Sequence, residues 1–183
     1  MLIVLSPVFL VLAIMIRRDS EGEVFFRQTR VTQYGRTFGI YKFRTMVKNA
    51  ESLGAQVTSQ NDMRVTKVGN MLRSYRLDEL PQLINILLGD MSYVGTRPEV
   101  PRYVAAYTNK MKATLLLPAG VTSIASIAYK DEDQLLQNAK NVDEVYINEV
   151  LPGKMAWNLK SIKEFSFLQD IKTMIDTVLA VLR

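Results

Sequence analysis

The residues best suited to chemistry are two adjacent carboxylates, Asp78 and Glu79, in the stretch LDELPQL at residues 77–83. Proline is tolerated in the first turn of a helix, so we expect a helix to begin near Asp78 or Glu79. Carboxylates at the positive end of a helix can cap backbone amides and interact favourably with the helix dipole. On this segment alone, a plain N-cap role for Asp78 and a catalytic role stay equally open.

Basic residues surround this pair along the sequence. Arg64, Lys67, Arg73 and Arg76 come before it, and Arg97 with Pro98 follows. Arg and Lys neutralise phosphate oxygens, one carboxylate can hold Mg²⁺, and another can act as nucleophile or base. The pattern therefore favours phosphoryl chemistry, and ordinary surface salt bridges are the competing explanation.

Composition narrows the chemistry further, because the 183 residues include no His and no Cys. This excludes Ser-His-Asp triads, cysteine nucleophiles, His or Cys metal sites and disulfides, and it leaves hard cations such as Mg²⁺. The chain carries 23 Lys and Arg against 18 Asp and Glu, a net charge of +5, while 48% of its residues are hydrophobic. A basic and apolar chain suggests an anionic partner: nucleic acid, phospholipid or a phosphorylated substrate. A solvated basic surface is the alternative.

The N-terminal segment, residues 1–16, contains no charge and ends at Arg17 and Arg18. A helix of this length spans about 24 Å, short of the roughly 30 Å hydrocarbon core of a bilayer. Pro7 should bend or break the helix, and the Ser6 hydroxyl can satisfy a carbonyl that the proline leaves free. We expect membrane contact, with the arginines at a cytoplasmic headgroup surface. A buried core helix is the alternative.

Hydrophobic patterning predicts an α+β chain that is mostly helical, without internal repeats. A β-hairpin is expected over residues 24–31 and 38–46, with a turn at 33–36, and a polar loop over 54–62. Residues 115–127 suggest a loop or short strand, and Gly89 a helix C-cap. The last helix carries an apolar stripe that suits either a membrane surface or the core. Helices are expected over 47–53, 64–76, 80–88, 99–111, 134–137, 142–150 and 162–182.

A series of motifs, taken in order along the chain, resembles the monotopic phosphoglycosyl transferases, the bacterial sugar transferase family. The likeness covers nearly the whole chain, and LDELPQL followed by GDMS and RPE is its most specific part. The matching motifs are Ser6-Pro7, VFFRQTRV at 24–31, YKFRTM at 41–46, DxRVTxxG at 62–69, LRSYRLDELPQL at 72–83, NxLxGDMS at 85–92, VGTRPE at 94–99 and SFLxDIK at 166–172.

The resemblance implies a reaction in which a phospho-sugar moves from a UDP-sugar to polyprenyl phosphate and UMP is released. By this analogy Asp78 attacks the β-phosphorus to form a covalent phosphosugar-aspartate, and it also holds Mg²⁺. Glu79 would assist the attack of the acceptor or handle a proton. The implied fold is one catalytic domain, residues 19–183, with amphipathic interfacial helices. It follows a membrane-associated re-entrant helix, residues 1–18, which is broken at Ser6 and Pro7.

The resemblance also implies the partners of the chain and where it acts. The expected partners are a UDP-sugar, polyprenyl (undecaprenyl) phosphate and inner-membrane lipid, with no nucleic acid, and a homodimer is compatible with the sequence. The expected location is the cytoplasmic face of the bacterial inner membrane, in glycoconjugate synthesis. The substrate-binding residues implied are Lys42, Arg44, Arg64, Arg73, Arg97 and Pro98.

Several positions depart from the family pattern, and two of them lie in or beside the LDELPQL and RPE motifs. Thr96 replaces the proline of a G-P-R-P sequence, and Arg76 stands where a small polar residue is common. An alternative hypothesis is therefore a catalytically impaired membrane scaffold or adaptor of the same fold. A basic nucleic-acid binder is a further alternative, and the apolar N-terminal segment argues against it.

Overall fold

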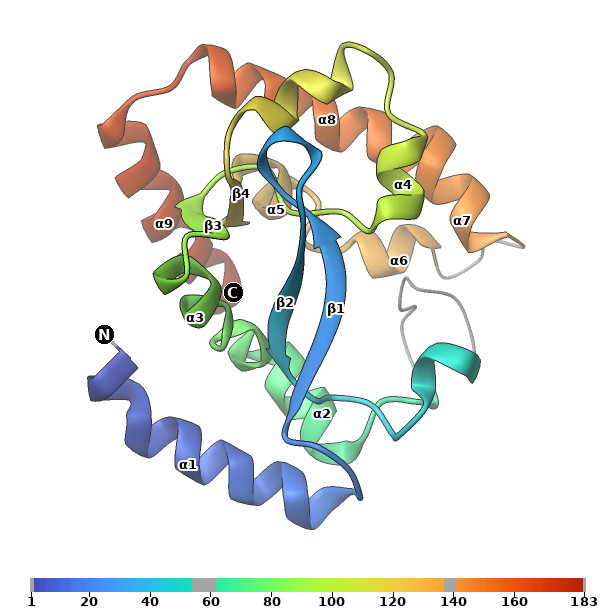
Figure 1. The fold of residues 1–183 in the computed structure, drawn as a ribbon, viewed down its shortest axis with the longest axis vertical. Coiled ribbons are helices and arrows are strands. Elements are labelled where there is room, and N and C mark those ends of the chain that lie inside the picture. Colours follow the sequence, from blue (N-terminus) through green and yellow to red (C-terminus); the bar gives the residue numbers. More distant parts are fainter. Residues whose placement is uncertain (1, 54–61, 137–140, 183) are drawn as a thin grey trace.

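The computed structural model describes residues 2–53, 62–136 and 141–182 and contains helices around two small sheets (Figure 1). β1 (Phe25–Val31) and β2 (Thr37–Phe43) form an antiparallel hairpin, and β3 (Met91–Val94) pairs in parallel with β4 (Ala119–Thr122). The hairpin crosses the middle of the molecule in Figure 1, between α8 at one end and α1 at the other. The predicted mostly helical α+β class and the hairpin are confirmed.

The helical elements differ greatly in length. The α-helices are α1 (Leu2–Asp19), α2 (Lys67–Ser74), α3 (Gln82–Leu87), α4 (Pro101–Ala105), α5 (Ile124–Ala128), α6 (Glu132–Leu136), α7 (Val142–Val145), α8 (Leu151–Lys163) and α9 (Phe167–Leu182). Short 3₁₀ segments are η1 (Gln33–Gly35), η2 (Ala50–Leu53), η3 (Leu77–Glu79) and η4 (Met111–Leu116), and η5 (Tyr146–Val150) is a π-helix.

Helix α1 runs without interruption through Pro7, so the break predicted at Ser6 and Pro7 is not observed. The physical reason lies in one hydrogen bond, because the Ser6 hydroxyl donates to the Ile3 carbonyl oxygen at 2.7 Å. That carbonyl is the one that an N–H at position 7 would have bonded in a regular helix. Within the described residues, no helix has both the length and the apolar character needed to cross a membrane.

The C-terminal half of α1 is attached to the rest of the fold. Leu12 and Ile16 are buried with Phe43 of β2 and Leu72 of α2 in one hydrophobic cluster. The Arg44 guanidinium donates to the carbonyl oxygens of residues 16, 20 and 21 at the end of the helix. An Asp19 carboxylate oxygen accepts from the Val68 backbone amide at 3.0 Å and so caps α2. These contacts fix the direction of α1 relative to the hairpin.

Helix α2 packs unusually close to the strand segment that follows β2. The Thr66 hydroxyl accepts from the Gly69 amide at 3.0 Å and forms the N-cap of the helix. Gly69 is buried directly against the Thr45 backbone, and a Cβ at this position would overlap the Thr45 carbonyl oxygen. This close approach explains why the DxRVTxxG motif ends in glycine.

The helices of the C-terminal half differ from the sequence prediction in two places. α8, over residues 151–163, was missed, because Pro152 and Gly153 suggest an interruption, whereas Pro152 lies in the first turn, where proline is tolerated. The single helix expected over 162–182 is two helices, and the Ser166 hydroxyl accepts from the Gln169 amide at 3.1 Å where the second begins. Of the loop predicted over 54–62, residues 54–61 lie outside the described residues, as do residues 137–140.

Other predicted elements are present with shorter bounds. The segment expected over 47–53 contains only the 3₁₀ turn η2, and that over 99–111 contains the five-residue α4. Residues 115–127 contain β4 between η4 and α5. Gly89 has φ of 78° after α3, as its predicted C-cap role requires.

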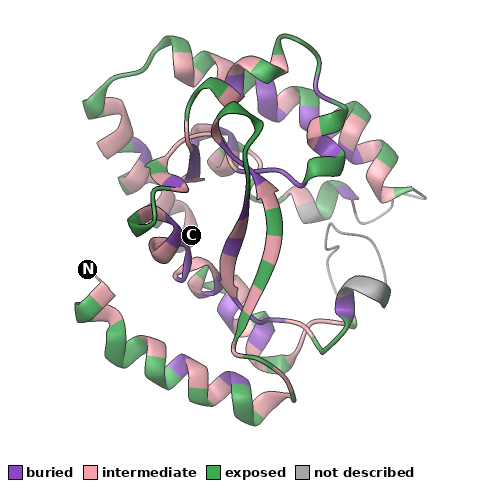
Figure 2. Ribbon diagram, in the orientation of Figure 1, coloured by how far each residue is buried: buried purple, intermediate pink, exposed green. Residues whose placement is uncertain are grey.

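Apolar side chains remain exposed along three elements (Figure 2). On α9, the predicted stripe does not pack into the core, since Leu168 is 76% exposed and Ile175 and Val178 are more than half exposed. On α1, Ile3 is 88% exposed, and Leu87 at the end of α3 is 76% exposed. In Figure 1 the N-terminal part of α1, α3 and α9 lie along the left side of the molecule. Clustered apolar exposure of this kind is typical of an interaction surface.

We predict that Gly69→Ala lowers the free energy of unfolding by about 2 kcal/mol, because the added methyl group pushes α2 away from Thr45. Chemical denaturation measures the change. Asn70→Ala, at the neighbouring exposed position of the same helix, is the matched control and should change stability by less than about 0.5 kcal/mol. Equal effects of the two substitutions would contradict the assigned packing.

Candidate functional site

The two central carboxylates lie on the short turn η3 between α2 and α3. Arg76, just before the turn, adopts a left-handed conformation with φ of 54° and ψ of 21°. This conformation is costly for a residue with a side chain and lets the backbone reverse direction after α2. Asp78 is buried and is not an N-cap residue, since Arg76 is the N-cap of η3 and Pro81 that of α3, and its Oδ1 has no hydrogen-bond partner in the described structure. The interpretation of Asp78 as a mere N-cap is therefore wrong.

Glu79 is held between two cations from distant parts of the chain. Arg97 donates to both carboxylate oxygens, at 3.0 Å from one guanidinium nitrogen to Oε2 and with a second contact to Oε1. The Lys42 ammonium, from β2, lies 3.1 Å from Oε1. Fork-like pairing of arginine with a carboxylate is the stronger class of ion pair. These contacts join β2, η3 and the segment after β3 at one point.

The two carboxyls have opposite electrostatics although they are adjacent. Burial would raise the pKa of Glu79, but the charges of Arg97 and Lys42 outweigh it and hold that pKa well below its ordinary value. Burial and the neighbouring Glu79 charge raise the pKa of Asp78, against the attraction of Lys42, Arg73 and Arg76. Separated pKa values in adjacent acids are typical of catalytic pairs with different roles.

Several predicted binding residues lie around this pair. Lys42 and Arg97 touch Glu79, and Arg73 acts on Asp78 through its charge while its Nε donates to the Thr45 hydroxyl at 3.0 Å. The Pro98 carbonyl oxygen accepts from Arg30 at 3.1 Å, which fixes the segment after Arg97.

Two predicted binding residues have structural partners elsewhere. Arg44 binds one carbonyl in the last turn of α1 and two just after the helix, as described above. Arg64 forms a two-pronged pair with Asp62, with its guanidinium 2.6 Å from Oδ2, and donates to the Ala50 carbonyl oxygen at 2.9 Å. Neither of these contacts involves Asp78 or Glu79. Ser6 and Pro7, the residues predicted to break the membrane helix, lie within α1.

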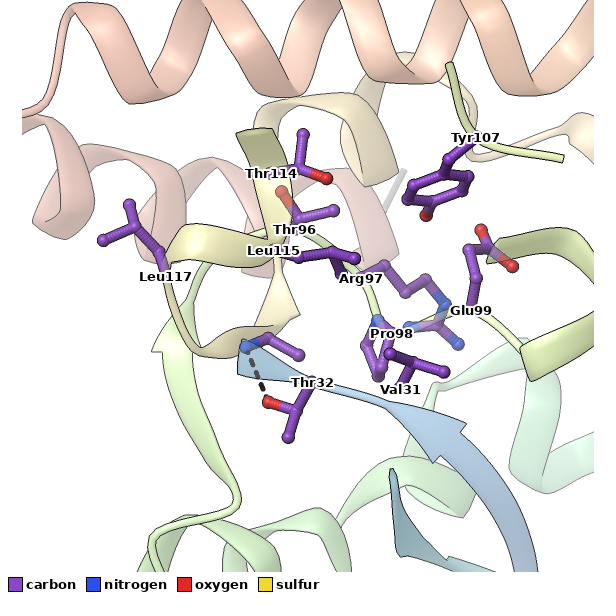
Figure 3. A pocket seen from close by; sticks show the side chains of 11 residues that line it. Val31, Thr32, Thr96, Arg97, Pro98, Glu99, Tyr107, Thr114, Leu115 and Leu117 are labelled. Atoms are coloured by element: carbon purple, nitrogen blue, oxygen red, sulfur yellow. Dashed lines mark hydrogen bonds between the residues drawn. The ribbon is translucent and has the colours of Figure 1, made fainter. Parts of the chain in front are cut away.

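The Arg97–Glu99 segment also lines a small pocket (Figure 3). It has about 220 Å³ of empty space, part of it open to solvent, and Thr96, Arg97 and Tyr107 help to line it. Glu99, which is buried and also lines the pocket, accepts a 2.5 Å hydrogen bond from the Tyr146 hydroxyl. Lys154 donates to Tyr146 and, at 2.8 Å, to Glu132. Sequence analysis missed this network, since only Glu99 lies in a motif and nothing in the pattern connects it to α8.

The donors available to a metal ion are few. The described residues contain no group of three or more His, Cys, Asp and Glu side chains that could together hold a metal. The buried, unpartnered Oδ1 of Asp78 is a suitable single oxygen ligand. Mg²⁺ is commonly bound by one or two carboxylates together with substrate phosphates and water, so the residues present fit this ion.

We predict that Arg97→Met lowers stability by about 3 kcal/mol near pH 7, because it leaves the largely covered Glu79 with Lys42 as its one remaining ion-pair partner among the described residues. The depressed pKa of Glu79 means that the ion pair stabilises the fold above the unfolded-state pKa and that this contribution is lost as pH falls through the folded-state pKa. Without Arg97 that pKa rises, so the deficit should shrink at acidic pH, where Glu79 becomes protonated.

Denaturation at pH 7 and pH 4 measures the deficit of Arg97→Met. Arg102→Met is the control, since Arg102 also pairs with a carboxylate, Asp143, but its side chain is 60% exposed. It should change stability by less than about 1 kcal/mol at both pH values. A deficit for Arg97→Met that is independent of pH would contradict the assigned role of Glu79.

Comparison with known proteins gives consistent results along the whole chain. The family model described as "Bacterial sugar transferase" matches residues 1–183. The chain is 35% identical over 180 residues to the UDP-N-acetylgalactosamine-undecaprenyl-phosphate N-acetylgalactosaminephosphotransferase of Aeromonas hydrophila, covering 97% of this chain and 40% of that protein. It is 37% identical over 182 residues to the UDP-glucose:undecaprenyl-phosphate glucose-1-phosphate transferase of Escherichia coli (strain K12), covering 97% of this chain and 36% of that protein.

A third relative carries a different sugar in its name. The galactosyl transferase CpsE of Streptococcus agalactiae serotype III (strain NEM316) is 33% identical over 192 residues, covering 99% of this chain and 39% of that protein. The chain thus spans well under half the length of these relatives. The match extends over the carboxylate pair, its basic neighbours and the Arg97–Pro98 segment, and the chain belongs to the bacterial sugar transferase family.

Proposed function

We propose that this chain transfers a sugar-1-phosphate from a UDP-sugar to undecaprenyl phosphate, with Asp78 as the nucleophile. The observation that supports this most directly is the buried Oδ1 of Asp78, which has no partner and lies beside a carboxylate held by two cations. An unpartnered buried carboxylate oxygen is costly and is retained where a ligand or a reaction uses it. The names of the relatives supply the substrate class.

In the first proposed step, a carboxylate oxygen of Asp78 attacks the β-phosphorus of the UDP-sugar. A bond forms from this oxygen to phosphorus, the bond from phosphorus to the bridging oxygen breaks, and UMP leaves with the electron pair. In the second step, a phosphate oxygen of the lipid attacks the same phosphorus, and Asp78 departs as a free carboxylate. The charges of Lys42, Arg73 and Arg76 around Asp78 would offset the negative charge of the transferring group.

The geometry favours a holding role for Glu79 over proton handling. Arg97 and Lys42 keep its pKa well below the ordinary value, so it remains ionised near neutral pH and cannot serve as a proton donor. Its strong pairing also makes it a weak base. By binding both cations, Glu79 would fix Lys42 and Arg97 at a set distance from Asp78, ready for phosphate oxygens.

We also propose that Mg²⁺ assists the reaction, held by Asp78 and by the diphosphate of the substrate. When bound, the ion would offset charge on the diphosphate and help UMP to leave. Asp78 contributes its unpartnered oxygen, and the basic residues around it contribute charge that orients the same phosphates.

The exposed apolar faces support a membrane location for this chemistry, which a lipid acceptor requires. α1 exposes Ile3, Val4 and Leu10, and α9 exposes Phe167 and Leu168. Helices that pack one face against the protein and expose apolar side chains on the other suit the headgroup boundary of a bilayer. The proposed setting is the inner face of the bacterial inner membrane, which both substrates can reach.

We predict that Asp78→Asn reduces UMP release by at least about 10³-fold, because an amide cannot form the acyl phosphate. Thermal stability should be unchanged or higher, since the raised pKa of Asp78 shows that its ionised form costs folding energy. UMP release is measured with undecaprenyl phosphate across a panel of UDP-sugars. Asp90→Asn is the control, because Asp90 is also largely covered but pairs with Arg36 and has no assigned part in the reaction. Near wild-type turnover by Asp78→Asn would refute the nucleophile assignment.

We predict that EDTA abolishes UMP release and that excess Mg²⁺ restores it. The fit of one buried carboxylate oxygen plus substrate phosphates to Mg²⁺ is the reason. The circular dichroism spectrum, recorded under both conditions, should not change. Full activity in EDTA would exclude the metal, and release of UDP in place of UMP would indicate a different transfer reaction.

A further inference from the structure

Gln82, one turn after Asp78, is a second buried polar side chain without a partner. Its exposed fraction is 0%, and neither its amide nitrogen nor its amide oxygen has a hydrogen-bond partner in the described structure. Native proteins rarely leave buried amides unsatisfied, because each one costs free energy. Two such groups, Asp78 and Gln82, occur four residues apart in one segment.

The backbone places these two side chains on the same side of the segment. η3 covers residues 77–79, Leu80 and Pro81 have helical φ and ψ, and α3 begins at residue 82. Side chains four residues apart along a helical backbone are neighbours, and Gln–Asp pairs at this spacing can hydrogen-bond. Asp78 offers an acceptor oxygen and Gln82 a donor nitrogen, so each supplies what the other lacks.

Asn85, on the next turn of α3, is a buried amide whose hydrogen bonds are made. It is also 0% exposed, yet its Oδ1 accepts from the Tyr41 amide at 2.9 Å and its Nδ2 donates to the Gly39 carbonyl oxygen at 3.0 Å. Asn85 thereby attaches α3 to β2. Gln82 and Asn85 are thus both buried on one short helix, but the hydrogen bonds of Asn85 are made and those of Gln82 are not.

Resting on the proposed function, we propose that Gln82 is a positioning residue whose amide N–H donates to Oδ1 of Asp78 and orients the attacking carboxylate. The bond forms through rotation of these side chains when substrate enters. Catalytic hydrogen bonds are often loose in the free enzyme and tighten in the substrate complex. Because Gln82 is fully covered, it acts through Asp78 and does not contact the substrate.

The test compares Gln82→Met with the wild type in thermal unfolding and in UMP release. Methionine has nearly the same shape without the polar atoms. The unfolding temperature should stay the same or rise, because a buried unsatisfied amide is removed. kcat should fall about 10- to 100-fold, since a misplaced nucleophile is costly. KM for the UDP-sugar should change by less than about twofold, because the contacts that bind the substrate before the reaction are unchanged.

Two further variants make the test specific. Gln82→Glu keeps the shape and the acceptor oxygens but loses the N–H donor when ionised, so its kcat should fall at least as far as that of Gln82→Met. Asn85→Leu removes a satisfied amide from the same helix, so its unfolding temperature should fall clearly below that of the wild type.

Three results would overturn the inference. The first is wild-type kcat in Gln82→Met. The second is a raised KM with unchanged kcat in this variant, which would indicate direct substrate contact. The third is a fall in its unfolding temperature as large as that of Asn85→Leu, which would indicate a structural bond. A wild-type chain that releases no UMP from any UDP-sugar would overturn the proposed function as well. An active wild type with a fully active Gln82→Met would overturn the inference alone.

Discussion

The ion pair of Glu79 with Lys42 and Arg97 is the interaction on which the arrangement of the site depends. The three residues come from a turn, a hairpin strand and a connecting segment that are separated by up to 55 positions in the numbering, and their charged atoms meet within about 3 Å. Glu79 is largely covered and is therefore costly without counter-charges, and the partly covered Lys42 and Arg97 lose their main partner without it. None of the three elements can therefore move away without leaving charge uncompensated. Asp78, next in the chain, takes its position from this constraint.

A second charged network supports the same segment from behind. Glu99, two residues after Arg97, is bound by Tyr146, whose hydroxyl also accepts from Lys154. This network connects α6 and α8 to the segment between Arg97 and Glu99. Large apolar side chains lie exposed on α1 and α9, although other apolar side chains form buried clusters in the interior. Exposed apolar side chains of this kind suit the proposed lipid acceptor.

Local patterns predicted much of this structure, and long-range pairing decided the rest. The hairpin and the C-cap at Gly89 follow from turn chemistry and side-chain alternation, which act over a few residues. The helix expected to begin near Asp78 or Glu79 begins at residue 82, after the turn η3. The sequence suggested Lys42, Arg44, Arg64 and Arg73 as phosphate-binding residues, but it does not show which group each basic side chain contacts in the fold. Arg44 and Arg64 pair with backbone carbonyls and Asp62, whereas Lys42 pairs with Glu79. Helix α8 was missed because the position of Pro152 relative to the helix start depends on tertiary contacts.

The attachment of α1 has a consequence for orientation. Arg44 donates to the Ile16 carbonyl in the last turn of α1 and to the Ser20 carbonyl just after it, and it lies two residues after Lys42. Asp19, at the end of α1, caps α2, whose other end leads through Arg76 to the carboxylate turn. The helix axis and the carboxylate pair are thus tied together along two separate routes. A surface that sets the tilt of α1 would also set the height of Asp78 above that surface, so the phosphate of a lipid chain would meet the nucleophile at one fixed depth.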